Sequence, residues 1–220
     1  MFNIDDWISE FVKILRQNFG DRIFFIGLQG SYARGEATAN SDIDIVVVLD
    51  DFSVNDVKKY NSILDEMPNR NLICGFIAGK NELINWEKSE IFQFYHDTKP
   101  LFGSLEILKP YLTNEVIDRA IKIGVCTIYH GCVHNMLHEK SGDILKSLYK
   151  NAAFVIQAIH FKKTGEYINS HGRLINFVDS AEKEILQNFL LLRKDDNLDF
   201  LKASAVIFEW SKNLINNIKN

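Results

Sequence analysis

Two aspartates lie two positions apart in an extended apolar segment. Asp42 and Asp44 flank Ile43 in DIDIVVVLD, residues 42–50. Because side chains alternate along a strand, both carboxylates are expected on one face, with Ile43 and Ile45 on the other. Adjacent carboxylates repel each other unless a cation neutralises them, and hard oxygen ligands near phosphate favour Mg²⁺. The pair predicts a magnesium site on a strand.

A glycine and a serine precede this pair by about a dozen residues. Gly30 and Ser31 follow the apolar run RIFFIGLQG, residues 22–30, where a strand ends and a helix or turn begins. Free backbone N–H groups and a hydroxyl at such a point can hold phosphate oxygens, and glycine allows close approach of a ligand. The two aspartates taken alone would fit a solvated strand face better than a metal site, so the whole segment must decide.

The joint pattern resembles the signature of polymerase β-like nucleotidyltransferases. It reads G-S-x-A-R-G and then S-D-I-D-I, between two apolar strands, within residues 27–50. The resemblance implies a small mixed sheet with flanking helices, in which Gly30 and Ser31 contact the terminal phosphates of the nucleotide. It also implies that Asp42 and Asp44 are the catalytic aspartates and bind Mg²⁺.

Two further polar residues of this loop are candidates for nucleotide binding. Arg34 and Ser41 could position the loop or the phosphates. For Arg34 the alternative is an ordinary ion pair with Glu36 or another nearby acid.

The chain departs from the superfamily pattern at a later strand. Members commonly carry a third carboxylate there, which completes the metal site or acts as base. Here the strand is NLICGFIAG, residues 71–79, and it contains no acid. The aligned position is Cys74 or Gly75, neither of which is a good Mg²⁺ ligand or a base at neutral pH. The substitutes considered are Glu82 and Asp97 as ligands and His96 as a base.

Two functional outcomes therefore stay open. In the first, the protein is a Mg²⁺-dependent enzyme that transfers AMP from ATP to a hydroxyl of a small acceptor. In the second, it is a catalytically weak or inactive relative that binds nucleotide or a partner protein, as antitoxin-like nucleotidyltransferases do. We favour the enzyme because Ser31, Asp42 and Asp44 are all present.

The composition limits the kinds of binding partner that are expected. The 220 residues are 46% hydrophobic and 25% charged, with a net charge of −4, so no basic field indicates nucleic-acid binding. Three cysteines are an odd number and fit free thiols. There is no signal-peptide pattern and no membrane-length apolar run. We expect a cytoplasmic protein without membrane or nucleic-acid partners, and a homodimer that completes the site stays open.

Periodicity divides the chain into an α/β half and a helical half. The first half is expected to contain helices at 4–19, 54–67 and 82–89 and strands at 22–30, 42–50, 71–79 and 91–98. The second half is expected to contain helices at 114–139, 142–163, 172–192 and 197–218, with breaks that include Asp195–Asn197. The domains expected are residues 1–110, for the nucleotide, and 111–220, a helical substrate-binding bundle. This layout resembles that of bacterial aminoglycoside and lincosamide nucleotidyltransferases.

One helix of the second half carries a stripe of metal-ligand residue types at four-residue steps: Cys126, His130, His134 and His138. Residues eight or twelve apart on one helix lie roughly 12–18 Å apart and cannot share an ion. We therefore prefer a polar seam to a metal site. The residues considered for the acceptor-binding surface are Tyr129, His130, His134, Tyr167, His171 and Arg173.

Overall fold

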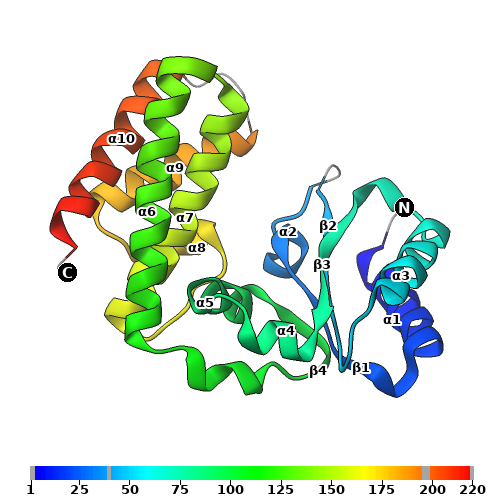
Figure 1. Cartoon of the computed structure of the whole chain (residues 1–220). Helices are drawn as coiled ribbons and strands as arrows, with labels where there is room; N and C mark the ends of the chain where they lie inside the picture. Colours follow the sequence, from blue (N-terminus) through cyan, green and yellow to red (C-terminus); the bar gives the residue numbers. More distant parts are fainter. Residues whose placement is uncertain (1–2, 39–40, 195–198, 219–220) are drawn as a thin grey trace. The chain divides into compact units, whose positions relative to one another are not determined.

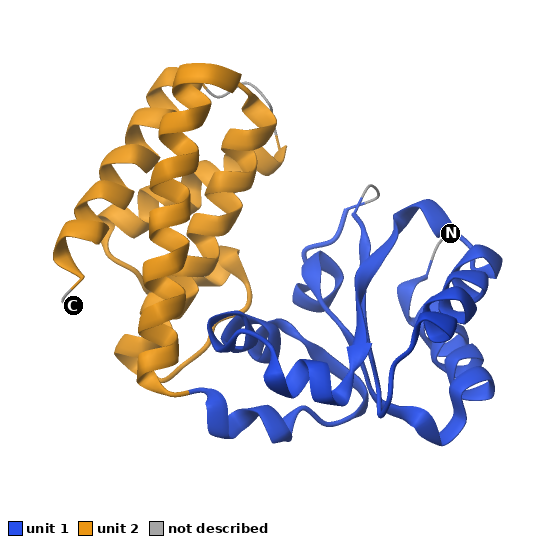
Figure 2. Cartoon of the chain, viewed as in Figure 1, with its two compact units in different colours: residues 1–112 blue, residues 113–220 orange. Residues whose placement is uncertain are grey.

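The computed structural model describes residues 3–38, 41–194 and 199–218. The expected helix break at Asp195–Asn197 lies outside these residues. The chain divides into two compact units, Met1–Leu112 and Thr113–Asn220, shown in blue and orange in Figure 2.

The first unit is built on one four-stranded mixed sheet (Figure 1). The strands run in the order β3-β2-β1-β4. Strand β1 is antiparallel to both of its neighbours, whereas β2 and β3 are parallel. Their bounds are Ile23–Leu28 for β1, Ile43–Leu49 for β2, Ile73–Gly79 for β3 and Lys99–Gly103 for β4. This sheet and the helical second unit confirm the expected fold class.

Helices cover both faces of this sheet. Helices α1 (Ile4–Phe19) and α3 (Val54–Glu66) pack on one face, against Ile43, Ile45 and the other odd-numbered residues of β2. Helices α4 (Lys80–Asn85) and α5 (Lys88–Asp97) lie on the opposite face (Figure 1), where Val46 and Val48 are buried. The alternation predicted for this strand is therefore present, and Asp44 shares its face with the two valines.

The fourth strand is not where the sequence placed it. Residues 91–98 were expected to be a strand, but they belong mainly to helix α5, and the strand β4 follows at 99–103. The apolar positions 91, 92, 94 and 95 have the i, i+1, i+3, i+4 spacing of a helix face, and Ile91 and Phe92 are buried. Glu87 caps the helix by accepting a hydrogen bond from the backbone N–H of Ser89. Pro100 is tolerated because β4 is an edge strand.

The second unit is entirely helical in its described residues. Its α-helices are α6 (Asn114–His134), α7 (Gly142–Thr164), α8 (His171–Leu174), α9 (Ser180–Lys194) and α10 (Phe200–Asn217), and a π-helical turn, Asn135–Glu139, follows α6. Tyr149 joins three of them, since its buried hydroxyl donates to the Ala203 carbonyl and accepts from Asn188. None of the described helices is long and apolar enough to cross a membrane.

One expected helix of this unit is broken in two. The segment 172–192 contains the short α8 and, after an irregular stretch, α9. Asp179 explains the new start, because its carboxylate accepts from the backbone N–H groups of Ala181 and Glu182 at 3.1 and 3.0 Å. Such a side chain caps a helix N-terminus and so favours a fresh helix over continuation of the previous one.

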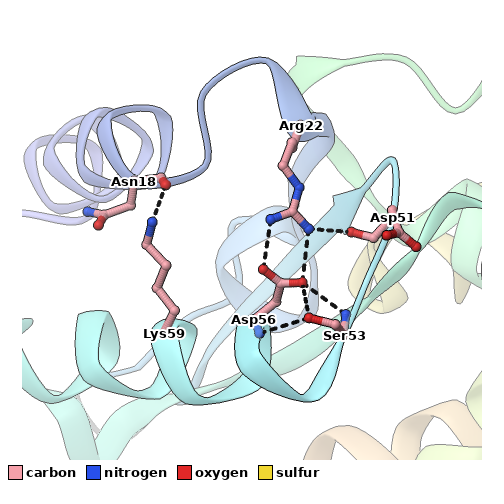
Figure 3. Close-up of polar contacts among 6 residues, drawn as sticks. All are labelled: Asn18, Arg22, Asp51, Ser53, Asp56 and Lys59. Atoms are coloured by element: carbon pink, nitrogen blue, oxygen red, sulfur yellow. Dashed lines mark hydrogen bonds and ion pairs between the residues drawn. The ribbon is translucent and has the colours of Figure 1, made fainter.

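An ion pair with a buried carboxylate holds the end of the sheet where β1 begins (Figure 3). Arg22 donates to both carboxylate oxygens of Asp56, at 2.8 and 2.9 Å, and to the Asp51 carbonyl at 2.8 Å. Asp56 also accepts from the hydroxyl and the backbone N–H of Ser53 and completes a capping box at the start of α3. Lys59 adds a hydrogen bond from α3 to the Asn18 carbonyl at the end of α1. These bonds tie β1 to the connection between β2 and α3.

The Arg22 hydrogen bonds lower the pKa of Asp56 well below its usual value, and the Ser53 bonds lower it further. A carboxylate with a lowered folded-state pKa stabilises the fold above its unfolded pKa of about 3.9 and loses this contribution as the pH falls below it. We expect Asp56→Asn to lower the free energy of unfolding by about 1–2 kcal/mol at pH 7. The difference in the free energy of unfolding between this variant and the unmodified protein should become smaller below about pH 4.

Urea unfolding at several pH values measures this difference. The matched control is Asp65→Asn, because Asp65 pairs with Arg70 while both side chains stay largely exposed. An exposed pair contributes at most about 1 kcal/mol. A loss in Asp56→Asn that is independent of pH, or no larger than in Asp65→Asn, would contradict the role given to the Arg22 pair.

Candidate functional site

The antiparallel pairing of β1 and β2 brings the glycine turn to the aspartate strand. Leu28 pairs with Ile45 at the end of the ladder, and the backbone N–H of Gln29 donates to the Asp44 carbonyl at 2.8 Å. Gly30 follows at once with φ +67°, and a Cβ added to it would lie 1.9 Å from Oδ2 of Asp44. The Asp44 carboxylate therefore occupies the space that any other side chain at position 30 would need.

The two aspartates differ in their exposure to solvent. Asp42 precedes β2 and is exposed, whereas Asp44 lies within the strand and is half-buried. Their neighbours Ile43 and Ile45 are fully buried under α1 and α3. The face of β2 that carries Ile43 and Ile45 is thus packed in the core. Asp44 lies on the opposite face, at the end of the surface that α4 and α5 cover.

The residues after Gly30 form the short helix α2 (Gly30–Arg34). Ser31 is half-buried, and its carbonyl accepts from the backbone N–H of Glu36 at 2.8 Å. The side chain of Arg34 is only 8% exposed, with Nε 3.5 Å from Glu36 Oε2. The ion pair considered from the sequence is therefore formed, although Nε itself is buried and makes no hydrogen bond to any residue that the structure describes.

Ser41 closes the other side of the loop. Its hydroxyl accepts from the backbone N–H of Thr38 at 2.8 Å, and its own N–H donates to the Thr38 carbonyl at 3.1 Å. This pair bridges residues 39–40, which lie outside the described residues. Ser41 therefore shapes the loop immediately before Asp42.

Strand β3 places Cys74 beside the aspartates. Cys74 pairs with Asp44 in the parallel register and is exposed. The next residue, Gly75, has φ +140°, and a Cβ there would lie 1.9 Å from the Ile45 carbonyl oxygen. Because that neighbour is backbone, position 75 excludes a carboxylate, and of the two aligned positions only Cys74 has room for a side chain.

Glu82 does not replace the missing carboxylate. A Cβ added to Gly79 would lie 2.0 Å from Glu82 Oε2, so the Glu82 carboxylate packs on Gly79. Gly79 pairs with Leu49, five residues along the strands from the Asp44–Cys74 pair. At about 3.3 Å per residue the two points are about 16 Å apart, which excludes Glu82 as a ligand of the same ion.

Asp97 and His96 lie at the same end of the sheet as Asp44 but further across it. They end α5, just before β4, which is two strands away from β2. Strands are about 4.8 Å apart, so β4, which follows these residues, lies about 10 Å from β2. Asp97 is buried and accepts from Gln93 at 3.3 Å, and burial lowers the pKa of His96 to about 4. Among the residues that the structure describes, no three His, Cys, Asp or Glu side chains form a group that could hold a metal ion.

The histidine stripe of the second unit stays a polar seam. His130, His134 and His138 are exposed along α6 and the π-helical turn, with ring centroids 6.4 and 4.8 Å apart. One of the residues considered for acceptor binding lies inside the bundle instead: His171 is fully buried against aromatic rings of α7 and α9, and such neighbours indicate core packing. Tyr129 is half-buried and stacks on Phe208.

Part of the chain is similar to two curated proteins. Two proteins of Methanocaldococcus jannaschii match the chain: "Putative protein adenylyltransferase MJ0604", 50% identical over 48 residues, and "Putative protein adenylyltransferase MJ1305", 32% identical over 62 residues. The matches cover 22% and 28% of this chain and 48% and 42% of those proteins. The chain thus spans about half the length of the curated relatives that it matches, or less.

The fold is similar to that of a solved antibiotic-modifying enzyme. The crystal structure of spectinomycin adenyltransferase AAD(9) from Enterococcus faecialis, with ATP and spectinomycin, superposes with a TM-score of 0.58 at 15% identity. The superposition covers 99% of this chain and 100% of that one. The nucleotidyltransferase domain family itself matches residues 8–123, more than half of the 220 residues. This match and the Gly30–Asp44 geometry confirm the resemblance seen in the sequence: the chain belongs to the nucleotidyltransferase family.

Proposed function

We propose that the protein transfers AMP from ATP to a hydroxyl of a small-molecule acceptor, with Mg²⁺ bound by Asp42 and Asp44. The observation that carries the proposal is the contact between Gly30 and the Asp44 carboxylate. It brings a turn suited to phosphate and a carboxylate suited to a cation to one point. The fold that the chain shares with a spectinomycin adenyltransferase over nearly its full length supports the small acceptor.

The donor set fits Mg²⁺. Two carboxylates offer hard oxygen ligands, and Mg²⁺ in phosphate-transfer sites is usually held by one or two carboxylates together with substrate phosphates and water. When bound, Mg²⁺ would neutralise phosphate charge and polarise the α-phosphate toward attack. The exposed Asp42 and the half-buried Asp44 are the residues that would hold it.

The roles of the other residues follow from their positions. The backbone at Gly30 and the Ser31 hydroxyl would hold the terminal phosphates, while Ser41 and the Arg34–Glu36 pair keep the loop in shape. The acceptor oxygen forms a bond to the α-phosphorus, the bond from this phosphorus to the bridging oxygen breaks, and pyrophosphate leaves with the electron pair. The hydroxyl proton passes to solvent, because Cys74 offers no carboxylate to take it.

Cys74 also favours a second candidate function. A site without a third carboxylate would suit a protein that binds nucleotide with little or no turnover, as a nucleotide- or partner-binding module. The helical unit, Thr113–Asn220, would then bind a partner protein. The two functions share the site and differ in turnover.

A direct assay separates them. The protein is incubated with Mg²⁺, each nucleoside triphosphate and a panel of hydroxylated metabolites and antibiotics, and acceptors are examined by mass for an added nucleoside monophosphate. We expect AMP addition to a small molecule. Tight binding of Mg²⁺ and ATP without any product, whether on a small molecule or on protein, would favour the second candidate.

The site assignment is tested by calorimetry with Mg²⁺ and ATP. The double variant Asp42→Asn with Asp44→Asn would lack the negative charge that holds the cation, so its affinity should fall at least about tenfold. The matched control is Asp50→Asn with Asp51→Asn, which changes the net charge equally at the exposed far end of β2. Equal affinities of the two double variants would exclude the assigned site.

Gly30→Ala tests the close contact with Asp44. The added methyl would meet the carboxylate at 1.9 Å, so we expect the Asp44 side chain to be displaced and affinity for Mg²⁺ and ATP to fall at least about tenfold. Gly35→Ala is the control, because Gly35 has φ +69° and nothing within 4 Å of the added Cβ. Both variants should lose about 1 kcal/mol of stability from the left-handed backbone, but only Gly30→Ala should lose affinity.

Cys74→Glu tests whether the missing carboxylate limits turnover. The position is exposed and paired with Asp44, so a carboxylate there could accept the hydroxyl proton. We expect kcat to rise at least about tenfold, below the roughly hundredfold or more that a well-placed general base contributes. Cys74→Ser, which supplies no carboxylate, should behave as the unmodified protein. If kcat is the same in both variants, proton removal is not limiting.

A further inference from the structure

Thr98 contacts the end of strand β1, which leads into the turn at Gly30. It is buried at the junction of α5 and β4, with 6% of its surface exposed. A Cβ added to Gly27 would lie 2.4 Å from Thr98 Cγ2, so the threonine methyl rests on the glycine. Two residues further on, Gln29 Nε2 donates to Thr98 Oγ1 at 2.7 Å. Residues two apart in extended chain share a face, so Thr98 holds one face of the chain at two points.

The direction of these hydrogen bonds is fixed. Thr98 Oγ1 also bonds the backbone carbonyl of Phe94. A carbonyl oxygen can only accept, so the single hydroxyl proton is committed to Phe94. Thr98 must therefore accept from Gln29, which means that the Gln29 amide presents its N–H group and not its oxygen. The chain of bonds from Gln29 through Thr98 to Phe94 thus holds the glutamine side chain in one orientation.

Gln29 is held from two other sides as well. Its backbone N–H donates to the Asp44 carbonyl at 2.8 Å, and its carbonyl accepts from Ala33 in α2 at 3.4 Å. It is the residue directly before Gly30 and the N-cap position of α2. Strand β2, helix α2 and, through Thr98, helix α5 therefore converge on one residue at the start of the turn.

We propose that Gln29 is a positioning residue for nucleotide binding, and that Thr98 locks it so that the turn of Gly30 and Ser31 stays seated against Asp44. The proposal rests on the proposed function. Without the Thr98 bond the half-buried glutamine side chain would be free to change rotamer, and the turn would keep only its backbone bonds to β2 and α2. Ligand affinity falls when the binding loop must be ordered on binding.

The bond between Gln29 and Thr98 differs from the local hydrogen bonds that a threonine commonly makes at the end of a helix. Thr164 at the end of α7 makes the same bond to the carbonyl four residues earlier, since its hydroxyl donates to the His160 carbonyl at 2.9 Å, and it accepts from the Glu166 N–H at 3.1 Å. Those partners lie within four residues of Thr164. Thr98, by contrast, accepts from a residue 69 positions away in the sequence. Thr164 therefore provides a matched control for the loss of a threonine hydroxyl at a helix end.

The test compares Thr98→Val, Thr98→Ser, Gln29→Met and Thr164→Val. Thr98→Val keeps the shape and loses the hydroxyl, Thr98→Ser keeps the hydroxyl and loses the methyl, and Gln29→Met leaves the Thr98–Phe94 bond intact. Amide hydrogen exchange of residues 29–35 is measured without ligand, and affinity for Mg²⁺ and ATP by calorimetry. Thermal unfolding shows that each variant is folded.

We expect faster exchange at residues 29–35 and about three- to tenfold weaker ATP binding in Thr98→Val and Gln29→Met, which is the effect of losing one hydrogen bond. Thr98→Ser should restore both properties, and Thr164→Val should change neither. The double variant Thr98→Val with Gln29→Met should bind no more weakly than the weaker single variant, because both remove one interaction.

Unchanged exchange in Gln29→Met and Thr98→Val would overturn the proposal, as would weaker binding that Thr98→Ser does not restore. The hydrogen-exchange measurement needs no nucleotide, so it tests the role of Gln29 and Thr98 independently of ATP binding. Absence of ATP binding by the unmodified protein would instead overturn the proposed function, so the two failures are distinguishable.

Discussion

The site depends on the register between β1 and β2. This register pairs Leu28 with Ile45 and hydrogen-bonds Gln29 to Asp44, so that Gly30 meets the Asp44 carboxylate. A shift by one residue would turn Asp44 into the core beneath α1 and bring Ile45 to the site. The odd-numbered residues of β2, from Ile43 to Leu49, are buried on one face, and Val46 and Val48 are buried on the other. The shift is therefore costly, because every buried side chain of the strand would change face.

The two ends of this pair of strands are held by different chemistry. At the start of β1, Arg22 and Asp56 form an ion pair that joins the strand to α3. At its end, Gln29 is held by the backbone of β2 and by Thr98. The first set of bonds stabilises the fold far from the site, whereas the second acts on the residue next to Gly30. Stability and site geometry can therefore be changed separately by substitution.

The third strand explains how the chain differs from the pattern of its superfamily. The parallel register brings Cys74 beside Asp44, where the superfamily commonly has a carboxylate, and the approach of Ile45 leaves no room for a side chain at Gly75. Glu82 is held at the other end of the strand by its packing on Gly79. In the proposed chemistry the two aspartates would still hold the Mg²⁺ that neutralises phosphate charge, while proton removal has no carboxylate assigned to it.

The sequence by itself determined the local features. The spacing of apolar residues predicted the first two strands, the helix at 4–19 and the helical second half. The motif spacing predicted the family. The sequence misplaced the fourth strand, because an apolar run with three aromatic residues fits either element until its burial is known. Only the tertiary structure decided that Cys74 lies beside Asp44, that Glu82 does not, that His171 is a core residue, and that Thr98 holds Gln29. The physical reason is that strand pairing and packing join residues far apart in the chain, and local sequence does not encode those distances.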